Sequence, residues 1–161
     1  MVAVAARRAP RVVEIPPDCV RRTPTPTSRT SQPREATLTT FSDFALPTPL
    51  VERLPSQGIA PPFPIQSASL PDTLAGSDVL GRGRTGSGKT LAFSLPVVTR
   101  LATSAARAAA EGRPRRRSAR PRALVLCPTR ELANQINATM EPLAKELGLV
   151  TTTVFGGVAQ S

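Results

Sequence analysis

The chain has 161 residues, of which 40% are hydrophobic, and a formal net charge of +10. This length fits one domain of ordinary size with a buried core. The chain contains no histidine, which excludes a histidine-based catalytic triad or zinc site. No apolar run approaches the roughly 18 residues that a membrane span needs, and the first residues lack the apolar block of a signal peptide. We therefore expect a cytoplasmic protein that does not cross a membrane.

The excess positive charge lies in two segments. Residues 1–40 hold seven arginines, three acidic residues and six prolines without sustained apolar periodicity, which predicts a disordered basic tail. Residues 113–122 hold six arginines and no acidic residue. Everywhere else, eight basic residues balance eight acidic ones. Flexible arginine segments suit a polyanionic partner, but they could also be solvated loops whose arginines reflect codon usage.

From residue 41 onward, helical and strand patterns alternate. In chain order we expect helices at 46–57 and 65–74, a strand at 78–81, a helix at 91–102, a strand at 123–128, a helix at 129–148 and a strand at 149–155. The run at 123–128, ALVLCP, is typical of a parallel strand buried on both faces. In the last helix, Leu132, Ile136, Met140 and Leu143 form one apolar stripe. This order predicts an α/β fold with a parallel sheet and flanking helices, interrupted by a basic surface insertion at about 104–122.

A phosphate-binding loop is predicted between the strand at 78–81 and the next helix. Residues 83–90, GRTGSGKT, satisfy the pattern G-x-x-x-x-G-K-[ST]. Its glycines let backbone N–H groups converge on phosphate oxygens, while Lys89 can reach the β and γ phosphates and Thr90 can ligate Mg²⁺. The alternative, a glycine-rich turn with a chance lysine, explains neither the strand before the loop nor the helix after it. We expect the nucleotide to contact the following residues: Arg84, Thr85, Gly86, Ser87, Gly88, Lys89 and Thr90.

Two more segments make the prediction specific. They are GIAPPFPIQ at residues 58–66 and PTRELA at residues 128–133. Together with TGSGKT and the Gly156-Gly157 pair, they closely resemble the first RecA-like domain of the DEAD-box ATP-dependent RNA helicases. The resemblance covers about residues 41–161. It implies a RecA-like fold that uses ATP and Mg²⁺, binds RNA and unwinds short duplexes locally.

The resemblance also assigns the nucleobase site. It implies that the Gln66 amide, with one donor and one acceptor side by side, selects adenine. Phe41, seventeen residues ahead of Gly58, would stack on the adenine face. Gln66 could instead be an exposed helix residue, and Phe41 a core aromatic. Lys89 and Thr90 would be the catalytic residues, with Thr90 also holding the metal.

RNA contacts are implied at two places in the last third of the chain. Thr129 can cap the helix that follows it, which places Arg130 near the positive end of that helix. Gly156 and Gly157 would let backbone amides approach a phosphate. Contacts of this kind follow the sugar-phosphate path and do not depend on base identity. The alternative for Arg130 is a solvated ion pair with Glu131.

The sequence departs from the family pattern in two respects. Gly83 stands where the family usually has alanine, from which we expect little harm. The sequence contains no Asp-Glu-Ala-Asp segment, no Ser-Ala-Thr segment and no second RecA-like domain. We therefore expect part of a longer helicase, with uncovered apolar surface, which alone binds ATP weakly and hydrolyses almost none. The alternatives are a catalytically silent fragment that binds nucleotide and RNA, and an unrelated phosphate-loop ATPase, which would predict neither GIAPPFPIQ nor PTRELA.

Overall fold

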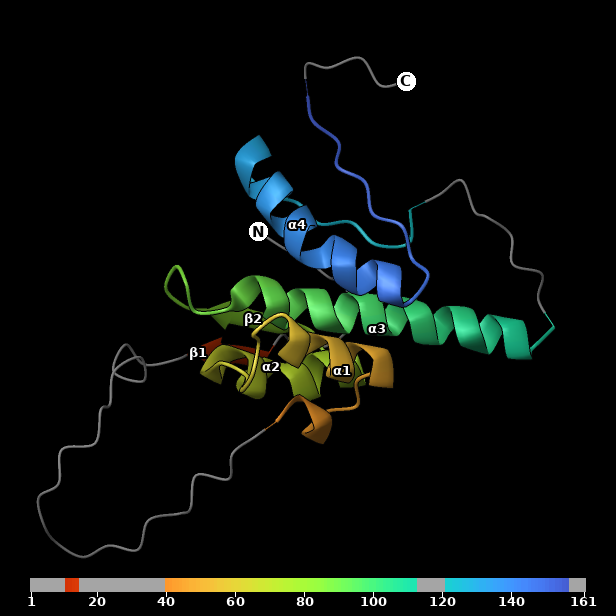
Figure 1. Cartoon of the computed structure of the whole chain (residues 1–161). Coiled ribbons are helices and arrows are strands. Elements are labelled where there is room, and N and C mark those ends of the chain that lie inside the picture. The colour runs from red at the N-terminus through yellow and green to blue at the C-terminus, as the bar shows by residue number, and fades with distance from the viewer. Residues whose placement is uncertain (1–10, 15–39, 113–120, 157–161) are drawn as a thin grey trace, which may run out of the picture.

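The structure, a computed structural model, describes residues 11–14, 40–112 and 121–156. Its elements in chain order are β1 (Arg11–Glu14), a 3-10 turn (Phe41–Asp43), α1 (Thr48–Ser56), α2 (Pro64–Ala75), β2 (Val79–Arg82), α3 (Lys89–Ala110) and α4 (Arg130–Glu146). The long helix α3 packs against α2 on one side and α4 on the other, and both strands contact α2 (Figure 1). This arrangement confirms the predicted α/β class.

The four predicted helices are all present, and local residue chemistry explains where they begin and end. Helix α2 starts at Pro64, whose fixed φ suits the first helical position, and stops at Gly76, which has a φ of 96°. Helix α1 ends at Ser56, one residue after Pro55. Helix α4 follows the predicted cap, because the Thr129 side chain accepts a hydrogen bond from the Leu132 N–H at 3.2 Å.

The hydrophobic core lies between the helices. The predicted stripe of α4 faces it, since Ile136, Met140 and Leu143 are buried and Leu132 is half-buried. The other helices and the 3-10 turn contribute the remaining buried side chains of the core cluster, which are Phe41, Leu50, Leu54, Leu70, Leu91, Leu95 and Val98. The helical apolar periodicity in the sequence therefore predicts the core-facing side of each helix correctly.

The strand predictions for residues 123–128 and 149–155 are wrong. Both segments run without regular secondary structure, and the described residues contain one sheet, in which β1 pairs with β2. A strand requires a hydrogen-bonded neighbour, and no described strand lies beside either segment. Several of their apolar side chains stay exposed, as we expected for an incomplete sheet: Leu124 is 70% and Val150 is 94% solvent-accessible. Val125 and Leu149, by contrast, pack against the core cluster.

Two segments outside the predicted elements are partly regular. Residues 11–14, within the expected disordered tail, form β1 and pair in parallel with β2, Arg11 opposite Val79 and Glu14 opposite Arg82. Helix α3 continues to Ala110, so the expected insertion begins as helix. Its alanine-rich sequence favours this continuation, as does a 3.0 Å ion pair between Arg107 and Glu111. The arginine-rich residues 113–120 lie outside the described residues.

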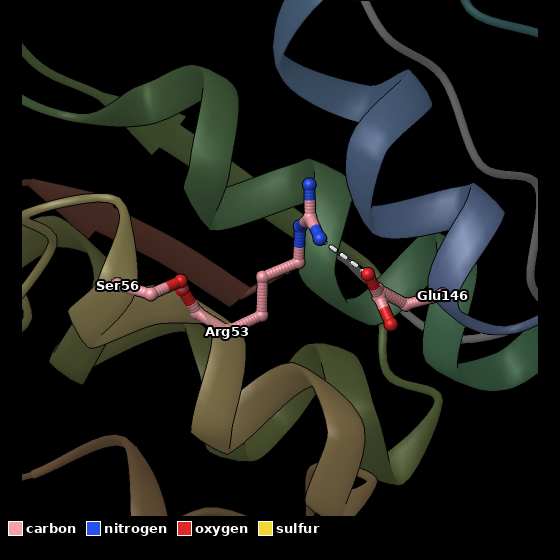
Figure 2. Close-up of polar contacts among 3 residues, drawn as sticks. All are labelled: Arg53, Ser56 and Glu146. Carbon is pink, nitrogen blue, oxygen red and sulfur yellow. Dashed lines mark hydrogen bonds and ion pairs between the residues drawn. The ribbon is translucent and has the colours of Figure 1, made fainter.

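An ion pair joins α1 to α4. The Arg53 guanidinium of α1 contacts the Glu146 carboxylate of α4, and the Arg53 carbonyl accepts a 2.6 Å hydrogen bond from the Ser56 hydroxyl (Figure 2). The two charged side chains are 33% and 35% accessible. Water therefore screens the pair, and its contribution to stability is small.

We expect a double-mutant cycle with Arg53→Met and Glu146→Gln to give a coupling energy of roughly 0.2–1 kcal/mol. The measurement is urea unfolding of the wild type, both single variants and the double variant. The coupling should shrink in 0.5 M NaCl, because salt screens partly exposed charges. A coupling above about 2 kcal/mol that salt does not change would contradict this description of the pair.

Candidate phosphate-binding and RNA-contact sites

The predicted phosphate loop connects β2 to α3, with a strand before it and a helix directly after it. Gly86 and Gly88 have φ values of 82° and 83°. This left-handed backbone conformation is sterically unfavourable for residues that carry a Cβ. The Ser87 N–H donates to the Arg84 carbonyl at 3.2 Å, which closes the turn. Because α3 begins at Lys89, its first unpaired N–H groups and its positive dipole end point into the loop, an arrangement suited to an anion.

The Lys89 ammonium lies inside this loop. It donates to the carbonyls of Gly83 at 2.8 Å and Arg84 at 2.5 Å, and it lies 3.5 Å from the Ser87 hydroxyl. Lys89 and the next residue, Thr90, are both half-buried in the first turn of α3. The loop thus holds a fixed positive charge at its centre, where an incoming phosphate can take the place of the carbonyl partners.

Gln66 connects the GIAPPFPIQ segment to the phosphate loop. Its Oε1 accepts a hydrogen bond from the Phe63 N–H at 2.9 Å, and its Nε2 donates to the Gly88 carbonyl at 3.0 Å. The side chain is 1% accessible, which excludes the alternative of an exposed helix residue. A glutamine amide has two N–H donors and two acceptor lone pairs, so each end of this amide retains capacity for one further partner.

The same contacts explain why residue 88 is a glycine. A Cβ on Gly88 would lie 2.5 Å from Gln66 Nε2 and 2.5 Å from Phe63 Cδ2. By contrast, a Cβ on Gly86 would meet nothing within 4 Å. The GIAPPFPIQ segment therefore packs directly on the residue that precedes α3, and any side chain at that position would push the two apart.

Gly83 is also closely surrounded. The family that the sequence resembles usually has alanine at this position. A Cβ there would lie 2.8 Å from Ser87 Oγ and 3.2 Å from Ile65 Cδ1. An alanine would require the Ser87 hydroxyl to rotate, which is a small change in a flexible side chain. The expectation that glycine does little harm at this position stays a prediction.

Phe41 lies in the hydrophobic core. It is 4% accessible and belongs to the cluster formed with buried leucines of α1, α2 and α3. This position matches the alternative of a core aromatic, and a base could stack on the ring only after surrounding side chains move. A second aromatic residue, Phe63, is 52% accessible and lies next to Gly88. Phe63 stands in GIAPPFPIQ, directly before Pro-Ile-Gln.

The predicted RNA-contact residues form a second cluster, at the start of α4. The Arg130 guanidinium donates to the Gly156 carbonyl and lies 5.9 Å from the centroid of the Phe155 ring. Among the described residues, the partners of Arg130 are therefore Gly156 and Phe155, and not Glu131, the alternative ion-pair partner. Thr129 caps the helix. Gly157 lies outside the described residues.

Both clusters lie at helix N-termini, and in Figure 1 helices α3 and α4 both begin on the left of the view. Each cluster combines a cation with the positive end of a helix, so each can bind an anionic group. Within the described ranges, no group of three or more His, Cys, Asp or Glu residues could hold a metal ion. In the same part of the chain, no helix has the length and apolarity that a membrane crossing requires.

Known proteins have sequences similar to this chain. The chain is 50% identical over 117 residues to the "ATP-dependent RNA helicase RhlB" of Sodalis glossinidius (strain morsitans), covering 73% of this chain and 27% of that protein. It is 43% identical over 123 residues to the "ATP-dependent RNA helicase SrmB" of Escherichia coli (strain K12), covering 76% and 26% respectively. The chain thus spans about a quarter of the length of these relatives.

The fold is similar to that of a solved helicase. The crystal structure of the RNA-helicase Prp28 from Chaetomium thermophilum bound to ADP matches with a TM-score of 0.63 and 32% sequence identity, over 74% of this chain and 27% of that one. A profile of the family described as DEAD/DEAH box helicase matches residues 63–161, which is more than half of the chain. The resemblance noted in the sequence is therefore confirmed, and the chain belongs to the DEAD/DEAH box helicase family.

Proposed function

We propose that this chain is the nucleotide-binding and part of the RNA-binding portion of an ATP-dependent RNA helicase. One arrangement carries the proposal. The Gln66 side-chain amide donates to the Gly88 carbonyl of the phosphate loop, and the Lys89 ammonium group donates to two other carbonyls of the same loop. The loop provides the phosphate site, and the GIAPPFPIQ segment provides the base site beside it. The names of the relatives support RNA as the second substrate.

In this function the residues of the loop bind and orient ATP. Lys89 exchanges its carbonyl partners for phosphate oxygens, and the N–H groups at the start of α3 donate to the same phosphates. The remaining donor and acceptor of Gln66 would pair with the adenine edge, which favours ATP over GTP. Because Gln66 is buried, the groups that cover its amide have to move before a base can reach it. Phe41 would join the base site only after a rearrangement of the core around it.

Mg²⁺ fits this site through a single protein ligand. Thr90 offers a hydroxyl oxygen in the first turn of α3, and the described residues contribute no carboxylate cluster. Mg²⁺ commonly keeps several waters and takes its other ligands from substrate phosphates. When bound, it neutralises charge on the phosphates, while Lys89 and Thr90 hold the nucleotide in place.

The cluster at the start of α4 binds the RNA backbone. Arg130 presents a guanidinium beside the dipole end of α4, and the Gly156 carbonyl and Phe155 ring set its direction. Thr129, Gly156 and Gly157 belong to the same proposed contact surface. Because such contacts go to phosphates, binding should not depend on RNA sequence.

The test is ADP binding measured by calorimetry on the whole chain. We expect Lys89→Ala to weaken ADP binding at least about tenfold, because a charge-assisted hydrogen bond to phosphate contributes roughly 1.5–3 kcal/mol. Lys145→Ala is the matched control: it removes the other lysine of the chain, which is exposed near the end of α4. Equal ADP affinity in the two variants would contradict the proposed function.

A further inference from the structure

The exposed ring of Phe63 is held in a fixed position beside the phosphate loop. The backbone N–H of Phe63 donates to Gln66 Oε1 at 2.9 Å. The backbone carbonyl of Phe63 accepts hydrogen bonds from the backbone N–H groups of Gln66 at 2.8 Å and Ser67 at 3.0 Å. Pro62 and Pro64 flank it and restrict the backbone on both sides. The residue therefore loses little further backbone freedom if its side chain binds a ligand.

Phe63 is unusual among the phenylalanines of this chain. It is the one with an exposed side chain, at 52% accessibility, whereas the other four are buried or half-buried. One edge of its ring faces Gly88, because a Cβ placed on Gly88 would lie 2.5 Å from Phe63 Cδ2 and 3.3 Å from Cγ. The ring therefore lies beside the residue that precedes α3, and about half of Phe63 faces solvent.

Gln66 relates this ring to the nucleobase. The amide nitrogen of Gln66 and the ring of Phe63 both border the same point, since each would contact a Cβ on Gly88 at 2.5 Å. A base at this point would therefore lie next to the ring, and it would reach the buried amide once the groups that cover Gln66 move. Aromatic rings bind the faces and edges of bases favourably, whatever the base identity.

We infer that Phe63 is a binding residue that packs against the base of a nucleotide whose phosphates occupy the loop. This role rests on the proposed function. Phe63 would supply affinity for a nucleoside over bare phosphate, while Gln66 would choose the base. The exposed Phe63 ring can meet the base without the rearrangement that the buried Phe41 would need.

Two ligands separate this role from an effect on loop shape. Inorganic pyrophosphate contacts the phosphate loop without a base, and ADP contacts both parts of the site. In the whole chain, Phe63→Ala should weaken ADP binding about 5- to 150-fold, which corresponds to the roughly 1–3 kcal/mol lost when a stacking aromatic is replaced by alanine. Pyrophosphate affinity should change by less than about twofold. Phe63→Trp keeps an aromatic face and should restore most of the ADP affinity.

The outcomes are distinguishable by titration calorimetry with both ligands. Unchanged ADP affinity in Phe63→Ala overturns the inference. An equal loss of ADP and pyrophosphate affinity also overturns it, because the ring would then act only by shaping the loop around Gly88. If wild-type ADP binding does not depend on Lys89, the proposed function itself fails, whatever the Phe63 variants show.

Discussion

Gly88→Ala is expected to destabilise the chain by roughly 2–5 kcal/mol and to weaken ADP binding strongly. The backbone at Gly88 has a φ of 83°, a conformation that costs an L-residue about 1–2 kcal/mol. The new methyl group would also overlap Gln66 Nε2 and Phe63 Cδ2, each 2.5 Å away. Displacing the buried Gln66 amide leaves polar atoms without partners, which costs about 1–3 kcal/mol more.

Gly86→Ala is the matched control for this variant. Gly86 has nearly the same φ, 82°, but a Cβ there would meet nothing within 4 Å. Gly86→Ala should therefore lose about 1–2 kcal/mol of stability from the unfavourable backbone conformation, without the added loss from steric overlap. Urea unfolding and ADP titration of both variants provide the comparison. If the two alanines cost the same, the close packing of Phe63 and Gln66 on the loop is not what requires glycine at position 88.

Leu95→Ala should be the most destabilising core substitution in α3, at about 2–5 kcal/mol. Leu95 is fully buried and belongs to the cluster that joins α3 to α1, α2 and α4. Removing its branched end leaves a cavity between helices that can relax only partly. Since small proteins are stable by only about 5–15 kcal/mol in total, this variant should unfold at a much lower urea concentration.

The same chemical change at Leu124 serves as the control. Leu124 is 70% accessible in the extended segment before α4, so Leu124→Ala should change stability by no more than about 0.5 kcal/mol. The measurement is the urea midpoint of both variants at equal protein concentration. A large loss of stability in Leu124→Ala would show that the Leu124 side chain is packed in solution, contrary to the structure.

The helices and the phosphate loop could be predicted from local sequence because their determinants are close together in the chain. A helix satisfies its own backbone hydrogen bonds within a few residues. Its ends are marked by neighbouring groups such as Pro64, Gly76 and Thr129. The loop needs glycines, a lysine and a helix start within eight residues. For the same reason, the family resemblance, which rests on short segments, was reliable.

The strands and the placement of aromatic side chains depend on contacts between distant residues. Residues 123–128 have the composition of a strand, but pairing requires a neighbour that no pattern within the segment specifies. The pairing of β1 with β2 joins residues far apart in sequence and carried no recognisable local signal. Phe41 and Phe63 are the same residue type, yet Phe41 is buried in the core and Phe63 is exposed beside the loop.

The sequence by itself thus determined the family, the helices and the chemistry of the phosphate loop, because each depends on residues within a few turns of one another. The tertiary structure alone decided which strands pair and which glycine is crowded at position 88. It also decided which phenylalanine borders the loop, and that Arg53 contacts Glu146. These features are set by contacts between segments separated by tens of residues. Their energies depend on how the whole core packs, which local patterns do not encode.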